Sequence, residues 1–359
     1  MRMNKHVTIR KASMLMALLL PLSCAQAPKQ MAQFVENPVQ LSEILWPDLP
    51  EVPRYRYAGQ LLGEENFVLP EGEEPGTLAT VWKWIAGIGD DTDAPDRSLV
   101  RPQSGMVSGS RIYVTDVGRG AVFVFDKING ELLIWNQADR GGSLVSPIGI
   151  TAGKEQSVLV ADSELKRILR YSSAGQVLGS FGQGILSRPT GLVRDAAGKR
   201  IYVVDTVAHD IKVFDDDGEL LDVIGHRGTG PGEFNAPTHI ALSDNRLYVT
   251  DTLNARIQVL EPDGDPLSVI GKRGLYLGNL TRPKGVTIDA DGHVYIVESY
   301  YDHLLVFDKQ GEFLLPIGGT GNEVGHFFLP SGVWNDDRGR IYVADMYNGR
   351  VMILQFLGG

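Results

Sequence analysis

Five aspartates recur at the same point of a repeated segment, and their carboxylates could do chemistry together. Carboxylate oxygens are the ligands that calcium prefers, so a ring of them could bind a hard cation. A residue that recurs in nearly every repeat is, however, typical of a turn, where it accepts backbone N–H bonds and pairs with a nearby arginine. We therefore expect a structural role for Asp116, Asp162, Asp205, Asp251 and Asp345.

His239 is the candidate metal ligand of the sequence. In Pro237-Thr-His239 it stands where four other repeats have the glycine of a Pro-x-Gly motif. A zinc site needs three or four ligands, and no other repeat has a histidine at this position. We expect an isolated histidine here rather than a metal site, with a divalent metal kept as the alternative.

Linear motifs of enzymes are absent from the sequence. It contains no Gly-x-Ser-x-Gly, no His-Glu-x-x-His, no phosphate loop ending in Gly-Lys-Ser/Thr and no paired cysteines. A site assembled from single residues of separate repeats would escape such a search, so the absence of these motifs does not exclude an enzyme. We predict no catalytic residues and no cofactor.

Loop residues that follow the repeated acid differ from repeat to repeat. Exposed aromatic and arginine side chains are favoured anchors in binding surfaces, and ordinary solvated loops are the alternative interpretation. The candidate binding residues are Arg119, Lys166, His209, Asn254, Tyr301 and Tyr347.

A repeat of about 46 residues must position all of these side chains. The repeated segment is a short strand motif that ends in an acid, and a Pro-x-Gly motif, an Asp-rich turn and a second turn with glycine recur around it. Its six copies are Arg111 to Asp116, Ser157 to Asp162, Arg200 to Asp205, Arg246 to Asp251, His293 to Glu298 and Arg340 to Asp345.

Four short strands in each repeat form a sheet that cannot bury both of its faces alone. Sheets of this kind bury their faces against one another when they stack around an axis. The sequence therefore predicts an all-β fold, a six-bladed β-propeller of four-stranded antiparallel blades.

The repeat resembles the NHL-repeat family of six-bladed propellers over residues 95–359. The Pro-x-Gly motif, the Tyr-Val-x-Asp strand and loops such as Asp251-Thr-Leu-Asn-Ala-Arg-Ile257 carry the resemblance. A related propeller, the peptidyl-hydroxyglycine lyase, places zinc-binding histidines near the start of its blades, and His239 resembles one ligand of that kind. The resemblance thus implies either a binding scaffold or an enzyme with its site in the central channel.

The sixth repeat ends after its third strand, so the ring needs a fourth strand from elsewhere. We predict that residues 54–61 close the ring, and that residues 79–88 complete the same region or cover the rim. The predicted domains are a signal peptide over 1–23, an extended proline-containing tether over 24–52 and the propeller over 53–359.

The first residues are typical of an export signal, in which basic residues precede the apolar run 14–22. The run ends in Leu20-Pro21-Leu22-Ser23-Cys24, which resembles the lipobox of bacterial lipoproteins, so we predict lipidation of Cys24. The alternative is an ordinary signal peptide cut after Ala25. The predicted location is a membrane-anchored lipoprotein facing the periplasm, or a soluble periplasmic or secreted protein.

Charge narrows the choice of partners. The chain has a net charge of −10, and loss of the basic leader leaves a value near −14. A negative charge repels the phosphates of nucleic acids, so we predict no nucleic-acid partner and contact with the membrane through the lipid anchor only.

We predict a non-catalytic extracytoplasmic scaffold that binds a protein or peptide partner in the cell envelope. The alternative is a metal-dependent propeller hydrolase or lyase, lactonase-like or peptidyl-hydroxyglycine-lyase-like, with its site in the central channel.

Overall fold

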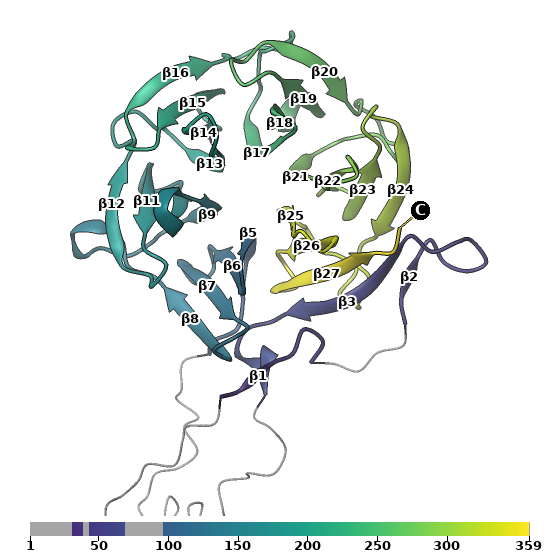
Figure 1. Ribbon diagram of the computed structural model, residues 1–359. Helices are drawn as coiled ribbons and strands as arrows, with labels where there is room; N and C mark the ends of the chain where they lie inside the picture. Colours follow the sequence, from purple (N-terminus) through teal and green to yellow (C-terminus); the bar gives the residue numbers. More distant parts are fainter. Residues whose placement is uncertain (1–30, 39–42, 69–95, 359) are drawn as a thin grey trace, which may run out of the picture. The chain divides into compact units, whose positions relative to one another are not determined.

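Six antiparallel sheets stand in a ring around a central channel in the computed structural model (Figure 1), which confirms the predicted six-bladed propeller. The structure describes residues 31–38, 43–68 and 96–358. In this part of the chain, helical structure is limited to the short 3-10 turns η1 (Glu64–Asn66), η2 (Asp139–Gly141), η3 (Lys154–Gln156) and η4 (Thr252–Asn254). None of the described helices has the length and apolar character needed to cross a membrane.

The blades are numbered here in chain order, each from its innermost to its outermost strand. Blade 1 contains β5 (Pro102–Ser108), β6 (Arg111–Asp116), β7 (Ala121–Asp126) and β8 (Glu131–Trp135). Blade 2 contains β9 (Pro147–Ala152), β10 (Val158–Asp162), β11 (Arg167–Tyr171) and β12 (Val177–Phe181). Blade 3 contains β13 (Pro189–Asp195), β14 (Arg200–Asp205), β15 (Asp210–Asp215) and β16 (Leu220–Ile224). Blade 4 contains β17 (Pro237–Ser243), β18 (Arg246–Asp251), β19 (Arg256–Leu260) and β20 (Pro266–Ile270). Blade 5 contains β21 (Pro283–Ile288), β22 (Val294–Glu298), β23 (His303–Phe307) and β24 (Phe313–Gly318).

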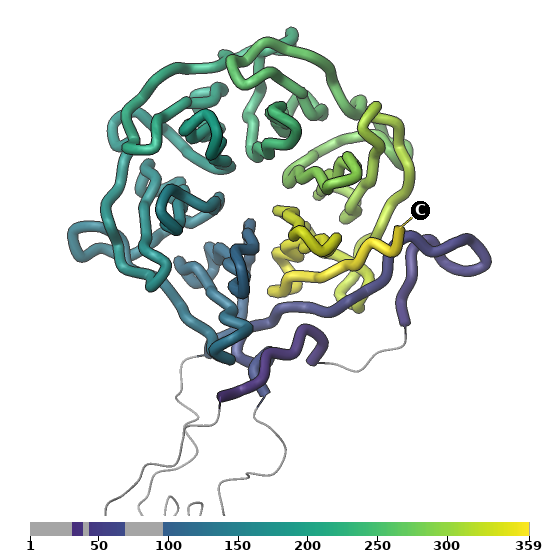
Figure 2. The backbone as a smooth tube through the Cα atoms, viewed as in Figure 1, coloured from purple at the N-terminus to yellow at the C-terminus, as the bar shows by residue number. Residues whose placement is uncertain are grey.

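Blade 6 joins the two ends of the described chain. It contains β25 (Val333–Asn335), β26 (Arg340–Asp345) and β27 (Arg350–Phe356), and its fourth strand is β3 (Tyr55–Leu61). β3 runs antiparallel to β27, with Tyr55 opposite Phe356 and Leu61 opposite Val351. Figure 2 shows this purple strand beside the yellow C-terminal one. The predicted closing strand is confirmed, while residues 79–88 lie outside the described residues.

Residues before β3 also contact the ring. β2 (Leu45–Trp46) pairs with β3, and β1 (Gln33–Phe34) pairs with β4 (Phe67–Val68). The Glu36 carboxylate forms an ion pair with Arg340 of β26. The described parts of the predicted tether, 31–38 and 43–52, are therefore attached to blade 6.

The second strand of each blade is buried on both faces because it lies between two neighbouring blades. In β14, for example, Ile201 and Val203 face the core shared with blade 2, and Tyr202 and Val204 face the core shared with blade 4. β-branched and aromatic side chains pack well on such pleated surfaces. This double burial explains why the Ile-Tyr-Val motif contains consecutive apolar residues instead of alternating with polar ones.

The glycine of Pro-x-Gly is required by the close approach of neighbouring innermost strands. A Cβ atom on Gly149 would lie 2.1 Å from the carbonyl oxygen of Thr190 in the next blade, and one on Gly332 would lie 2.2 Å from the carbonyl oxygen of Gln103. In blade 1, which reads Pro102-Gln-Ser-Gly105, a Cβ atom on Gly105 would lie 2.3 Å from the indole ring of Trp334 in blade 6. The motif thus sets the narrow bore of the channel.

Candidate functional site

In blades 1 to 5, a β-bulge at the start of the innermost strand turns one side chain toward the mouth of the channel. In blade 6 the corresponding residue, Ser331, lies just before β25. In blade 4, Pro237 pairs with Asp251 and the register shifts before Ile240, so the residues between them leave the regular ladder. Bulges are a common means of redirecting a side chain near a site. The residue after the proline in all six blades lines one cavity of about 230 Å³: Gln103, Ile148, Thr190, Thr238, Lys284 and Ser331.

Two cations project into this cavity from blade 5. Lys284 occupies the x position of Pro283-Lys-Gly285, and Arg282 immediately precedes the motif. Burial lowers the pKa of Lys284, and the charges of Arg282 and Arg188 lower it further. Within the described ranges, no carboxylate oxygen lies within 4.0 Å of the Lys284 ammonium.

Arg282 is held in place by neutral groups. Its Nε donates to Ser299 Oγ at 3.1 Å and its Nη2 donates to the Ser299 carbonyl oxygen at 3.1 Å. The guanidinium also lies over the ring of Tyr300, 6.0 Å from the centroid. None of these contacts neutralises the charge, so the arginine is oriented at the cavity and still able to bind an anion.

His239 lies deeper in the channel, between this cavity and a second one of about 270 Å³ that follows the innermost strands. Both ring nitrogens are buried and have no hydrogen-bond partner among the described residues. Burial, helped by the charge of Lys284, lowers the pKa of His239 to about 3, so the ring is neutral at physiological pH. The positive charge of Lys284 also disfavours a metal cation at this imidazole.

Hydroxyl groups around the mouth are tied into bonds between blades. Thr206 Oγ1 donates to the carbonyl oxygen of Pro237 at 2.7 Å, so the hydroxyl of Thr190, 2.9 Å from Thr206 Oγ1, is the donor in that pair. Thr252 and Thr238 repeat the arrangement one blade later. Thr190 and Thr238 therefore present acceptor lone pairs to the cavity, while the charged donors there are Lys284 and Arg282 and the side-chain amide of Gln103 is a neutral donor.

The recurring acids hold these bulges in place, as predicted for turn residues. Asp205 accepts from the backbone N–H groups of Ser187 and Arg188, and Glu298 accepts from those of Thr281 and Arg282. In blades 4 and 6 the acid also binds an arginine, with 2.8 Å between Arg256 Nε and Asp251 Oδ2. These carboxylates are buried at the start of each blade and do not meet in the channel.

Several of the predicted binding residues form hydrogen bonds to neighbouring loop residues. Arg119 binds Asp96 and the carbonyl oxygen of Ser98, and Asn254 donates to Gly228 and Asp251. His209 Nδ1 accepts the N–H of Ala236, which leaves Lys166 as the exposed cation of the set.

Tyrosines of blades 5 and 6 lie in the loops after β22 and β26, next in sequence to the cavity-lining residues Ser299 and Met346. Tyr347 is 54% exposed, packs on Phe328 and lies under Arg101, while Tyr301 packs edge-on against Tyr300. The structure thus places Tyr301 and Tyr347 on the face that contains the mouth.

Our sequence interpretation missed Lys284 and Arg282, and it chose Tyr301 as the candidate binding residue of its loop instead of the neighbouring Tyr300. The signal that could have found Lys284 is its position, because it is the one charged residue among the six x residues. Tyr300 lies two residues after the repeated acid, and that position also carries the exposed side chains of Val207, Leu253 and Tyr347.

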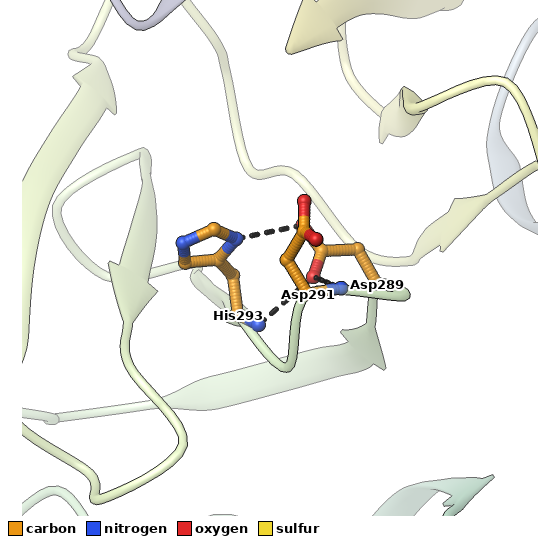
Figure 3. Close-up of side chains that lie close together, drawn as sticks. All are labelled: Asp289, Asp291 and His293. Atoms are coloured by element: carbon orange, nitrogen blue, oxygen red, sulfur yellow. Dashed lines mark hydrogen bonds and ion pairs between the residues drawn. The ribbon is translucent and has the colours of Figure 1, made fainter. Parts of the chain in front are cut away.

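A separate acidic cluster lies in the turn between β21 and β22, at the opposite end of blade 5. Asp289, Asp291 and His293 are the one group of three or more His, Cys, Asp or Glu side chains in the described part of the chain whose ligand atoms lie within 4.8 Å of one another. Figure 3 shows His293 and the two carboxylates around the turn. Asp289 accepts from the N–H groups of Asp291 and His293, from His293 Nδ1 and from the Tyr295 hydroxyl. These bonds give Asp289 the role of a turn cap.

Comparisons with known proteins agree with this architecture. A family model described as a 6-bladed beta-propeller matches residues 189–257 and 279–358. NHL repeat-containing protein 2 from Gallus gallus is 29% identical over 118 residues, which cover 29% of this chain and 15% of that protein. The match therefore spans a small part of that relative's length.

Solved structures of propellers resemble the chain at low sequence identity. Virginiamycin B lyase from Staphylococcus aureus has a TM-score of 0.53 and 17% identity, with 72% of this chain and 96% of that chain covered. An auxiliary nutrient binding protein from Bacteroides ovatus has a TM-score of 0.55 and 14% identity, with 72% and 70% covered. At such identities the likeness shows the fold alone. The family match and the six blades together show that this chain is a six-bladed β-propeller, and its repeats are similar to NHL repeats.

Proposed function

We propose that the chain is a non-catalytic binding propeller of the cell envelope, and that it holds a protein or peptide on the face that contains the channel mouth. The observation that carries this proposal is the ring of exposed side chains two residues after the repeated acid. Val207, Leu253, Tyr300 and Tyr347 are 54 to 58% exposed in four successive blades. Large exposed apolar side chains that gather on one face are typical of interaction sites.

Charge on the same face supports a partner with acidic groups. Arg101, Arg188 and Arg282 each precede the first proline of blades 1, 3 and 5, so they surround the mouth at alternate blades. Arg101 and Arg282 also contact Tyr347 and Tyr300. Aromatic and arginine side chains are the residues that most often dominate binding energy. An acidic partner would meet positive charge here although the chain as a whole is negative.

The experiment that tests the proposal is affinity purification of the full-length tagged protein from gently solubilised cell envelopes. A stoichiometric partner should co-purify with the wild type and be lost from a Tyr300→Ser/Tyr347→Ser variant. Ile128→Ser is the matched control, because Ile128 is 70% exposed in a turn that lies at the opposite end of its blade. Equal capture by all three proteins would contradict the proposed face.

A second candidate function is a metal-dependent hydrolase or lyase, and the unpartnered nitrogens of His239 favour it. A metal there would have to overcome the repulsion of Lys284. Metal analysis of the purified protein decides between the two candidates. A stoichiometric divalent metal that is lost in His239→Ala would support the enzyme. If the protein contains no zinc after dialysis against zinc, a zinc site of useful affinity is excluded.

A further inference from the structure

We infer that the cavity at the channel mouth binds a carboxylate carried on a short aliphatic group, with Lys284 as its charge partner and Arg282 as a second donor. The inference deepens the proposed function, because the cavity lies within the proposed binding face. The two possible sources of such a carboxylate are the C-terminal residue of a protein partner and a free organic acid. Both present the same chemistry to the cavity.

The charge balance of the described residues is the first argument. Several half-buried cations elsewhere in the ring have carboxylate partners: Arg194 Nε lies 2.6 Å from Asp216, Arg167 lies 2.8 Å from Asp139, and Arg350 lies 2.8 Å from Asp345. Arg170 is an exception, since it donates to the backbone carbonyl oxygen of Asp216 and lies over the ring of Phe181, but it does not line the cavity. Lys284 and Arg282 have none within the described residues. Removal of an ammonium from water without a partner is costly. An anion between Lys284 and Arg282 would compensate for that cost.

The lining of the cavity defines the rest of the ligand. Ile148, Leu329, Pro330 and Met346 give it apolar walls. Its volume of about 230 Å³ is below the roughly 300 Å³ at which pockets begin to hold drug-sized ligands. A single branched aliphatic group with a carboxylate fits these limits, and a folded domain or a nucleotide does not.

Hydrogen-bond direction favours an N–H group beside the carboxylate. Thr190 and Thr238 present lone pairs, since their protons are used within the blades. These acceptors would repel a second carboxylate and would bind an amide N–H. The C-terminal residue of a peptide has both groups on one carbon atom, whereas a simple organic acid has only the carboxylate.

Calorimetric titration of the full chain with small carboxylates tests the inference. N-acetyl-leucine represents a chain terminus, 4-methylvalerate represents a free acid, and N-acetyl-leucinamide is the control without charge. We expect saturable binding of at least one carboxylate, and at least tenfold weaker binding of the amide. A tenfold preference for N-acetyl-leucine would identify a chain terminus as the source, and one for 4-methylvalerate would identify a free acid.

Variants locate the site. Lys284→Met removes the charge with little change of volume, and we expect at least tenfold weaker binding of the carboxylate. Lys309→Met is the matched control, because Lys309 is an exposed lysine in the turn at the other end of blade 5. Thermal melting of each variant checks that it is folded. Undiminished affinity in folded Lys284→Met, or no binding of either carboxylate to the wild type up to about 10 mM, would overturn the inference.

Failure of the carboxylate inference can be distinguished from failure of the proposed protein-binding function. Capture of an envelope partner that depends on Tyr300 and Tyr347, together with no binding of small carboxylates, would refute the inference and leave the proposed function intact. Carboxylate binding that depends on Lys284, without any captured partner, would support the inference and refute the protein-binding proposal.

Discussion

Lys284 is the residue at which stability and function conflict. Its ammonium is largely withdrawn from water and lies near Arg282 and Arg188, two further positive charges. Such a residue weakens the folded ring, since burial and like charges both disfavour the ammonium form. In many proteins, replacing a residue that serves function but strains the fold makes the protein more stable and less active.

Replacement of Lys284 by methionine should therefore stabilise the protein. We expect the free energy of unfolding of Lys284→Met to rise by about 1 kcal/mol, because an unpaired buried charge is replaced by an apolar side chain of similar length. The measurement is urea unfolding at neutral pH. Lys309→Met should stay within about 0.5 kcal/mol of the wild type, as is usual for exposed positions. A loss of stability in Lys284→Met would mean that the ammonium has a structural role.

His239 should make the protein sensitive to acid. Its pKa is about 3 in the folded chain and near 6.5 in an unfolded one. Between these values the unfolded chain binds more protons, so the free energy of unfolding falls as the pH falls, by up to about 1.4 kcal/mol per pH unit. In His239→Gln this contribution is absent. Urea unfolding at about pH 7 and about pH 4.5 should show a smaller loss of stability in the variant. Equal losses would show that the ring gains a proton within the fold.

At the scale of elements, β3 is the strand that completes the ring. It supplies Tyr55, Tyr57 and Leu61 to the cores on the two sides of blade 6. The Tyr55 hydroxyl also bonds to that of Tyr295 in blade 5, at 3.0 Å. Loss of β3 would expose the backbone edge of β27 along its whole length, and an unpaired edge of this kind favours aggregation.

A permuted chain tests this role of β3. Deletion of residues 53–68 should prevent cooperative folding, because it removes about three large buried side chains at a cost of roughly 2 to 5 kcal/mol each. Transfer of the same residues to follow Gly359 should restore it, since Leu357 N already bonds to Arg54 O at 2.8 Å and a short loop can join the two strands. Circular dichroism and thermal melting provide the measurement. A permuted chain that does not fold would show that the natural connection to residue 69 is itself required.

The sequence predicts the strands well because their burial is repeated. The Ile-Tyr-Val motif recurs unchanged in three blades and with other apolar residues in the remaining three, so each copy supports the assignment of the others. The closing strand follows from the missing fourth strand of blade 6. The cavity could not be predicted in this way, because it depends on bulges at the blade starts. A bulge changes which side chain faces the channel without changing the apolar pattern of the strand. Lys284, Arg282 and Tyr300 therefore became visible as neighbours only in three dimensions.

At the scale of the whole molecule, the ring has two unlike faces. Around the mouth, the loops after the second strands carry exposed apolar side chains and the residues just before the innermost strands include arginines. The turns at the other end of the blades include acidic sequences such as Asp215-Asp-Asp-Gly218 and Asp289-Ala-Asp-Gly292. A lipid at Cys24 would tether such a ring to a membrane, and a partner would have to bind the ring there. The proposed attachment requires that Cys24 is modified.

Substitution of Cys24 tests the attachment. In a bacterial host, wild-type protein should partition into the detergent phase with the membrane fraction, and Cys24→Ser should appear in the soluble fraction, because a covalent acyl chain contributes about 0.8 kcal/mol per buried CH₂ group. Metabolic labelling with a fatty acid is the direct measurement. Labelling of Cys24→Ser, or none of the wild type, would favour an ordinary signal peptide.

The six x residues have a further consequence for how such proteins can diversify. Each is contributed by a different blade, each follows a proline that fixes the local backbone, and none belongs to the buried motif of the second strand. Six single codons, spaced almost evenly along the gene, therefore specify the chemistry of one cavity. Ligand preference can change by substitution at these positions while the buried motifs of the second strands stay constant, so a small combinatorial library there would sample many specificities on one scaffold.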